Sequence, residues 1–203
     1  MHIALLGADH PARTHTEHMI RNVYASTYGA LIEAFPPLLV AALNAHGQPL
    51  CAAGLRNQRT GFFSECYLDA PVEASISTVA GAPVARGEII EVTTLAGVAP
   101  GLALDLAAFV IAHGRRAGMH WGLFTATAPL RRALTRAGLG TRDLAPARAE
   151  RVPDAASWGS YYRMRPRVCA VADPRHVPVL GRLVRAARAS VFAAPGTRAA
   201  AVA

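Results

Sequence analysis

Residues 89–101 read IIEVTTLAGVAPG, an apolar, β-branched run that leads into a loop bounded by glycines. The run predicts a strand over 88–96, and the apolar spacing after it predicts a helix over 102–117. A further strand over 119–125 and an arginine-rich helix over 129–137 follow. This order is typical of a βαβ unit with a second helix, in which the N-terminus of the first helix can bind an anion.

The rest of the chain supplies further layers around this unit. A TxxE capping box at Thr14–Glu17 predicts the start of a helix, and Gly29 predicts its end. The other expected elements are a hairpin of strands over 38–43 and 50–56, an extended segment over 62–68, a helix that Asp69 caps, and a last strand between 158 and 172. Together they predict an α/β fold, with a mixed sheet between layers of helices.

Composition indicates a globular protein, since 52% of the 203 residues are hydrophobic and only 17% are charged. Cys51, Cys66 and Cys169 are too few and too far apart for a disulfide framework, which favours a reducing compartment. His15 and His18 lie three residues apart without a recognisable third ligand, so we predict no metal site. We find no signal peptide or transmembrane run, and therefore expect a cytoplasmic protein.

The charge is distributed unevenly along the chain. The net charge of +8 comes from arginine alone, with 5 Arg and 9 acidic residues in 1–110 but 16 Arg and 4 acidic residues in 111–203. A basic C-terminal half suits an acidic or phosphate-bearing partner. No helix-turn-helix, zinc-finger or RNP pattern accompanies it, so we predict no sequence-specific binding of nucleic acid.

Glu91 stands in the middle of the apolar strand. Alternation along a strand places it on the same face as Ile89, Thr93 and Leu95. An unpaired carboxylate in such surroundings is unfavourable, which leaves two interpretations. Glu91 is either a structural group paired with an arginine or with backbone amides, or a general base whose pKa is raised by its apolar surroundings.

Two further sites could bind an anion. The loop from Gly97 to Gly101 presents backbone N–H groups at a helix start, where a pyrophosphate or phosphopantetheine can bind; the alternative is a simple turn. Arg56 follows a run of small residues at the end of the hairpin. It is either a ligand for an anion or for Glu91, or a solvated strand end.

Polar and aromatic side chains offer sites for an acceptor and for proton transfer. Glu65, Tyr67 and Asp69 alternate along one extended segment, and their shared face either binds a cationic amine or simply faces solvent on an edge strand. Tyr162 is either a core aromatic or a hydroxyl that returns a proton to a leaving thiolate.

Several short blocks resemble the thermostable hemolysin family, a relative of the GNAT acyltransferases. The blocks are AAGLR at 52–56, ECYLDAPVE at 65–73, EVTTLA at 91–96, FTAT at 124–127 and WGSYY at 158–162, in addition to the text around 21–43. The resemblance implies a GNAT-like domain over 1–172. Residues 173–203 lie outside it and are expected to form a basic, Arg/Ala-rich, partly helical tail.

The element order also resembles the acyl-homoserine-lactone synthases, which share the GNAT fold and take acyl groups from acyl carrier protein. That resemblance implies a substrate-binding role for Arg21 and matches Glu91 to the first residue of an E-x-S-R motif. Thr94 stands where that family has arginine, which disfavours lactone synthesis. The GNAT pyrophosphate signature is absent from 95–101, which favours a carrier-protein donor over coenzyme A.

We therefore predict an N-acyltransferase that moves an acyl group from acyl carrier protein or acyl-CoA to a small amine. Glu91 is the expected base, and a Glu91→Gln protein is expected to fold but not to turn over. Backbone N–H groups of Thr93, Thr94 and Leu95 would polarise the carbonyl. The basic surface for a carrier protein would consist of Arg115, Arg116, Arg131, Arg132 and Arg136.

Two other classes remain open. The first is a membrane-active protein, in which an amphipathic helix over 176–192 lies on anionic lipid. The second is a non-catalytic GNAT-like binding module.

Overall fold

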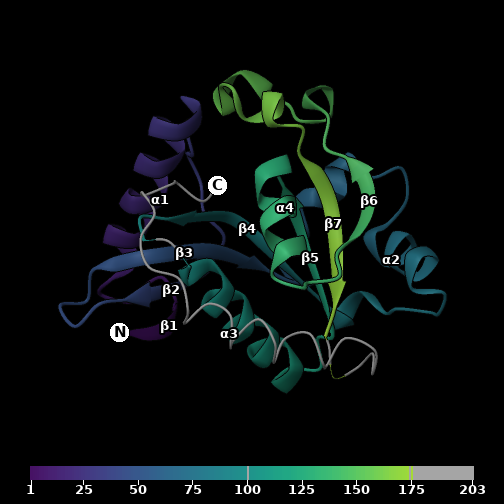
Figure 1. Ribbon diagram of the computed structural model, residues 1–203, viewed down its shortest axis with the longest axis horizontal. Coiled ribbons are helices and arrows are strands. Elements are labelled where there is room, and N and C mark those ends of the chain that lie inside the picture. Colours follow the sequence, from purple (N-terminus) through teal and green to yellow (C-terminus); the bar gives the residue numbers. More distant parts are fainter. Residues whose placement is uncertain (100, 174, 176–203) are drawn as a thin grey trace.

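The structure is a computed structural model that describes residues 1–99, 101–173 and 175. Its centre is a seven-stranded sheet in the order β1-β2-β3-β4-β5-β7-β6, in which only β4 and β5 pair in parallel (Figure 1). The strands are β1 (His2–Leu6), β2 (Leu38–Leu43), β3 (Pro49–Arg56), β4 (Ile89–Gly97), β5 (Trp121–Ala126), β6 (Arg142–Pro146) and β7 (Arg167–Ala172).

Helices cover both faces of the sheet. They are α1 (Arg13–Tyr28), α2 (Val72–Ala80), α3 (Leu102–Arg116) and α4 (Ala128–Arg136), with short 3-10 turns η1 (Phe63–Tyr67), η2 (Arg86–Glu88), η3 (Ala149–Arg151), η4 (Ala155–Trp158) and η5 (Tyr161–Met164). Side chains of α1 and α2 pack on one face, and those of α3 and α4 on the other. The predicted α/β sandwich is confirmed.

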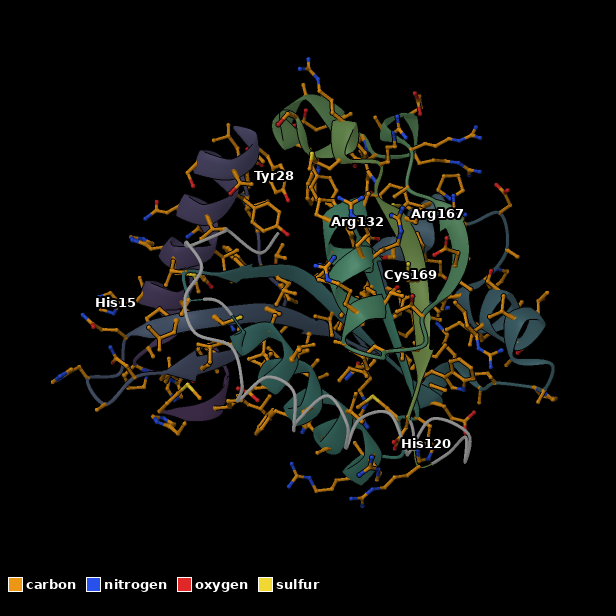
Figure 2. All side chains as sticks on the ribbon, viewed as in Figure 1. His15, Tyr28, His120, Arg132, Arg167 and Cys169 are labelled. Carbon is orange, nitrogen blue, oxygen red and sulfur yellow. The ribbon has the colours of Figure 1, made fainter. Side chains whose placement is uncertain are left out.

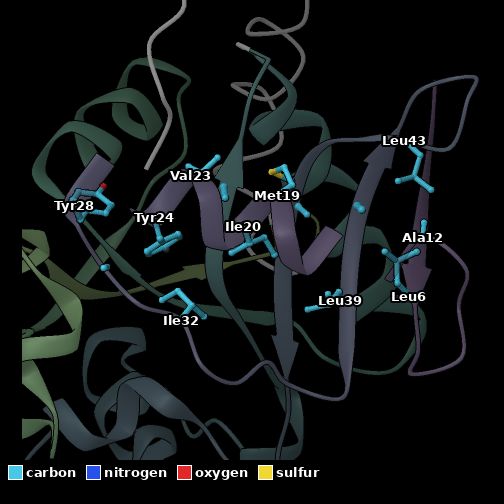
Figure 3. Packing of buried hydrophobic residues seen from close by; sticks show 14 of the residues in the cluster. Leu6, Ala12, Met19, Ile20, Val23, Tyr24, Tyr28, Ile32, Leu39 and Leu43 are labelled. Carbon is cyan, nitrogen blue, oxygen red and sulfur yellow. The ribbon is translucent and has the colours of Figure 1, made fainter. Parts of the chain in front are cut away.

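Helix α1 packs through one apolar stripe against the first strands of the sheet (Figure 3). Gly29 ends the helix as predicted, with φ 67° and its N–H bonded to the Ala25 carbonyl. The predicted capping box is wrong, because the helix already begins at Arg13. The Arg13 guanidinium binds Glu17 and donates to three main-chain carbonyls, which together fix the start of the helix.

The segment 62–68 is not extended, contrary to the prediction. It forms the 3-10 turn η1, because the buried carboxylate of Glu91 accepts hydrogen bonds from consecutive N–H groups at Phe63 and Ser64. Consecutive N–H groups point in opposite directions along a strand, so an extended segment could not make both bonds. Asp69 does not cap the next helix; the N-cap of α2 is Pro71, and the Val72 N–H donates to Glu65.

The end of the sheet differs from the prediction as well. The last strand begins at Arg167, and the residues from 155 to 164 form η4 and η5 instead. Strands β1 and β6 were not expected. Both are short edge strands. β6 is only half-buried and has no continuous apolar run, whereas the apolar run of β1 is only four residues long, at 3–6.

No described helix is long and apolar enough to cross a membrane. The helix predicted over 176–192 lies outside the described residues, and the division into a domain over 1–172 and a tail over 173–203 stays a prediction.

Candidate functional site

The site begins where the parallel strands β4 and β5 separate. Their pairing runs from Ile89 opposite Trp121 to Val92 opposite Phe124. Beyond that point β4 stays with β3, whereas β5 stays with β7 (Figure 1). Backbone groups that face a neighbouring strand elsewhere in the sheet therefore border a gap here. A cavity of about 470 Å³ occupies this region.

A β-bulge in β4 lies at the same point. Ala52 pairs with Ala96 and Gly54 with Thr93, so two residues of β4, Thr94 and Leu95, lie opposite Ala53. Thr94 has φ 46°, which is rare for a β-branched residue. The predicted face of Leu95 is wrong, because the bulge shifts the alternation of β4. Leu95 packs on the α3 face with Val92 and not on the Glu91 face.

The hydroxyls of Thr93 and Thr94 border this cavity. Both oxygens are buried and have no hydrogen-bond partner among the described residues. The Thr93 side chain packs directly against Gly54. A Cβ at position 54 would lie 2.5 Å from the Thr93 hydroxyl and 2.6 Å from Pro36 Cγ. Close approach therefore requires glycine at position 54.

The cavity has two chemically different walls. The wall on the α1 face contains the apolar residues Ile32 and Val152 but is rich in aromatic and polar side chains: Tyr24, Glu33, Arg56, Phe63, Ser64, Tyr67, Asp154, Trp158 and Tyr161. Mainly apolar side chains of α3, α4 and the adjoining strands line it on the other face: Val92, Leu95, Ala103, Leu106, Ala107, Val110, Phe124, Leu130, Leu134 and Val171. Thr93 and Thr94 lie at the boundary, where β4 leaves β5.

Glu91 is fully buried below the cavity, and it is not among the described residues that line it. Its two carboxylate oxygens accept hydrogen bonds of 2.7 Å from the N–H groups of Phe63 and Ser64. Burial raises the pKa of Glu91, whereas the hydrogen bonds from Ser64 and Phe63 and the charge of Arg56 oppose that rise. The carboxylate thus holds η1 against the sheet, which is what the structural interpretation of this residue requires.

Ser64 connects the buried carboxylate to the cavity. Its N–H binds Glu91, and its hydroxyl lies 2.8 Å from the Thr125 hydroxyl on β5, at the edge of the gap. Both residues line the cavity, and Ser64 is buried. Neither residue was predicted from the sequence, although Thr125 lies in the FTAT block. The two residues are 61 positions apart in the chain, and they meet only because η1 packs against β5.

Tyr67, the last residue of η1, forms a pair with Tyr162. The hydroxyl oxygens of Tyr67 and Tyr162 are 2.7 Å apart, and of the two only Tyr67 is among the described residues that line the cavity. Burial raises the pKa of both phenols, so both are protonated at neutral pH. Trp158 and Phe63 complete this aromatic wall, with ring centroids 5.7 Å apart.

The predicted acceptor residues are divided between the cavity and its surroundings. Arg56 lines the cavity and is the only arginine among the described residues that do. Arg21 supports the wall from outside, because its guanidinium donates to the Ile32 carbonyl and lies 4.7 Å from the Phe35 ring centroid.

Glu65 and Asp69 belong to ion pairs and are absent from the described cavity lining. Arg86 binds both oxygens of Glu65 at 2.6 and 2.7 Å, and Arg151 binds Asp69. The predicted shared face of Glu65, Tyr67 and Asp69 does not form, because the segment is a 3-10 turn.

The predicted donor site is only partly brought together. Thr93, Thr94 and Leu95 line the cavity, whereas Gly97 and Gly101 are absent from its described lining. Gly97 pairs with Cys51 on β3, and Gly101 is the N-cap of α3 with φ 86°.

The predicted basic surface is partly engaged in the protein's own contacts. Asp173 accepts two hydrogen bonds from Arg115, and Arg131 donates to the carbonyls of Ala126 and Arg165. Arg132 and Arg136 lie with Arg131 around a shallow depression on α4; Figure 2 shows Arg132 there. Within 1–99, 101–173 and 175, no three His, Cys, Asp or Glu side chains are grouped to hold a metal ion.

A mixed seven-stranded sheet whose parallel strands separate at a bulge defines the class of fold. It is the GNAT-like fold of the acyl-homoserine-lactone synthases. BjaI, described as a CoA-dependent acyl-homoserine lactone synthase and solved with MTA, is 14% identical with a TM-score of 0.61, over 97% of this chain and 94% of BjaI. At this identity the likeness shows the fold alone.

Two other solved structures are similar to the chain. FeeM, an N-acyl amino acid synthase from uncultured soil microbes, is 14% identical with a TM-score of 0.58, over 85% of this chain and 90% of FeeM. TofI in an apo form is 14% identical with a TM-score of 0.58, over 92% of this chain and 99% of TofI.

The chain belongs to the thermostable hemolysin family, whose family model matches residues 6–176. No curated protein matches the sequence. The family resemblance seen in the short sequence blocks is confirmed.

Proposed function

We propose that the protein is an N-acyltransferase that moves an acyl group from a thioester to the amine of a small acceptor. The observation that carries the proposal is the cavity at the separation of β4 and β5, apolar on one side and polar and aromatic on the other. Such a cavity suits a reaction between an amphipathic donor and a polar acceptor. The fold shared with BjaI and FeeM, both named as synthases, supports it.

The donor occupies the gap between the strands. A pantetheine arm is an extended chain with amide groups, and it matches the edge of β4 from Thr93 to Leu95, which no longer pairs with β5. The acyl chain extends into the apolar half of the cavity beside Ala107 and Leu130. Gly97 and Gly101 hold the outer part of the donor at the start of α3.

The transfer follows the chemistry of amide formation. The amine nitrogen attacks the thioester carbonyl carbon, a C–N bond forms, and the carbonyl electron pair moves to oxygen. When the carbonyl re-forms, the C–S bond breaks and the thiolate leaves. The nitrogen loses a proton to a base, and the thiolate gains one.

Glu91 is the proposed base, and it acts through Ser64 or a water because it is absent from the described cavity lining. Its raised pKa makes it a stronger base than an ordinary glutamate. Tyr162 is the proposed donor to the thiolate, through Tyr67, to which its hydroxyl is bonded. Backbone N–H groups of the bulge polarise the carbonyl.

The acceptor occupies the polar half of the cavity. Arg56 provides one positive charge there, which suits an acceptor that carries a carboxylate, such as an amino acid. Glu65 and Asp69 are bound to arginines, so any contribution from them to binding is indirect. Arg21 contributes by holding the loop at Ile32 that forms one side of this half.

The donor is either acyl carrier protein or coenzyme A. An acidic carrier protein would dock on the arginines around α4, where Arg132 and Arg136 lie beside the depression. Release of free thiol, measured with acyl-CoA and with acyl carrier protein in the presence of amino acids and simple amines, tests the proposal. Thiol release that requires an amine supports it. Donor binding without thiol release would indicate a binding module instead.

Glu91→Gln is a poor test of the base, contrary to the expectation from sequence. Each carboxylate oxygen accepts a backbone N–H, and the amide group of glutamine would present a donor to one of them. The fold around η1 would therefore change together with the chemistry. The pH dependence of the rate separates the two effects.

A further inference from the structure

Two side-chain hydroxyls where β4 leaves β5 have no hydrogen-bond partner in the described part of the chain. The Thr93 and Thr94 hydroxyl oxygens are buried, line the cavity and make no hydrogen bond to any described residue. Buried hydroxyls in folded proteins are nearly always hydrogen-bonded, because leaving one unsatisfied is unfavourable. By contrast, the nearby Thr125 hydroxyl on β5 is satisfied by Ser64.

The backbone at the same place is strained. Thr94 has φ 46°, a conformation that β-branched residues avoid. Thr94 lies in the bulge of β4, opposite Ala53 of β3, and it lines the cavity. Strained residues of this kind cluster at ligand-binding sites.

The position of the hydroxyls indicates which ligand atom they bind. Both residues lie in the part of β4 that no longer pairs with β5, between the apolar half of the cavity and the polar half, and the Thr93 hydroxyl lies over Gly54 of β3. In an acyl thioester that spans both halves, the carbonyl is the group between the apolar chain and the incoming amine. A carbonyl oxygen only accepts hydrogen bonds, and a hydroxyl can donate one.

We propose that the Thr93 and Thr94 hydroxyls bind the carbonyl oxygen of the acyl thioester and donate hydrogen bonds to it as negative charge develops there. This inference rests on the proposed N-acyltransferase function. It adds two side-chain donors to the backbone N–H groups of the bulge. Each donor stabilises the transition state more than the ground state, because the oxygen is more negative in the transition state.

Valine is the matched replacement, because it keeps the β-branched shape and removes only the hydroxyl. If the hydroxyls are unpartnered in the free protein, Thr93→Val and Thr94→Val raise the melting temperature, by roughly 2 to 4 °C each. Thr78→Val, at an exposed position on α2 where the hydroxyl bonds to the Ala74 carbonyl, serves as the control and gives no rise. A fall in melting temperature at Thr93 or Thr94 would show a structural hydrogen bond and overturn the proposal.

Binding of two inert donor analogues tests the contact with the carbonyl oxygen. One analogue is a ketone, in which CH2 replaces the sulfur of acyl-CoA; the other is a thioether without the carbonyl. Wild-type protein is expected to bind the ketone about 10-fold more tightly. In Thr93→Val and Thr94→Val the ratio of the two dissociation constants falls toward one. In Thr93→Ser and Thr94→Ser the preference for the ketone returns.

Kinetics separate this inference from the function on which it rests. In the valine variants kcat falls on the order of 100-fold with little change in the donor KM, whereas the serine variants keep activity. An active wild type whose valine variants keep full kcat would overturn this inference alone. A wild type that binds neither analogue and transfers no acyl group would overturn the proposed function together with it.

Discussion

Replacing Gly159 with alanine should displace the neighbouring Trp158, which lines the cavity. Gly159 has φ 54°, and a Cβ there would overlap the carbonyl oxygen of Tyr28 and also approach Gly29 within 2.9 Å. The same Tyr28 carbonyl accepts hydrogen bonds from the N–H and the hydroxyl of Ser160, at 2.8 and 3.2 Å. These contacts join the segment that carries Trp158 to the end of α1.

The expected loss of stability has two parts. Alanine at φ 54° and ψ −121°, a conformation that favours glycine, costs about 1 to 3 kcal/mol, and the steric overlap costs about 1 to 3 kcal/mol more. The free energy of unfolding should therefore fall by about 2 to 6 kcal/mol. For a chain of this length, each kcal/mol lowers the melting temperature by roughly 2 to 4 °C.

Gly118→Ala is the matched control for Gly159→Ala. Gly118 has φ 75°, but no atom lies within 4 Å of a Cβ built there, so this variant carries only the conformational cost. Thermal and denaturant unfolding of both variants, followed by circular dichroism, measure the difference. If Gly159→Ala loses no more stability than Gly118→Ala, the close packing of 158–162 on α1 is refuted.

Three other predictions concern the site and its support. The kcat/KM should fall as pH decreases through the pKa of Glu91. Because burial raises that pKa, the fall should occur at a higher pH than for an ordinary glutamate. A fall at the ordinary glutamate pKa would argue against Glu91 as the base. Glu65→Gln should lower the free energy of unfolding by about 1 to 2 kcal/mol at neutral pH. Because Arg86 holds the pKa of Glu65 below its usual value, this difference from wild type should shrink as pH falls below the usual glutamate range, and a pH-independent difference would contradict the ion pair. Ala107→Phe should reduce kcat/KM for long acyl chains roughly 10- to 100-fold and spare acetyl donors, and equal losses for both would contradict an acyl chain beside α3.

The regular elements near the core could be predicted from the sequence because their signals are local. The periodic run over 102–117 marks α3, and the break between 43 and 50 marks the β2–β3 hairpin. The bulge in β4 could not be predicted, because it depends on how β3 pairs with β4. Leu95 therefore packs on the face opposite to the one that simple alternation gives it.

For the residues of the site, too, local signals could be predicted from the sequence and long-range contacts could not. Thr93 to Leu95 and Arg56 were identified, because they lie on strands or strand ends with clear signals. Ser64 and Thr125 were not, since their contact arises only after Glu91 folds η1 into a turn. Glu65 was interpreted as a ligand for an amine because its partner Arg86 lies 21 residues away in the chain.

The most direct test of the central claim is mass spectrometry of the products formed from acyl donors and a pool of amines. Acyl carrier protein and coenzyme A, each loaded with chains of mixed length, are incubated with the protein and with amino acids labelled with ¹⁵N. We expect loss of the acyl group from at least one donor and a new N-acyl product that contains the label. Both donors left fully acylated, with no labelled amide over the whole pool, would contradict it.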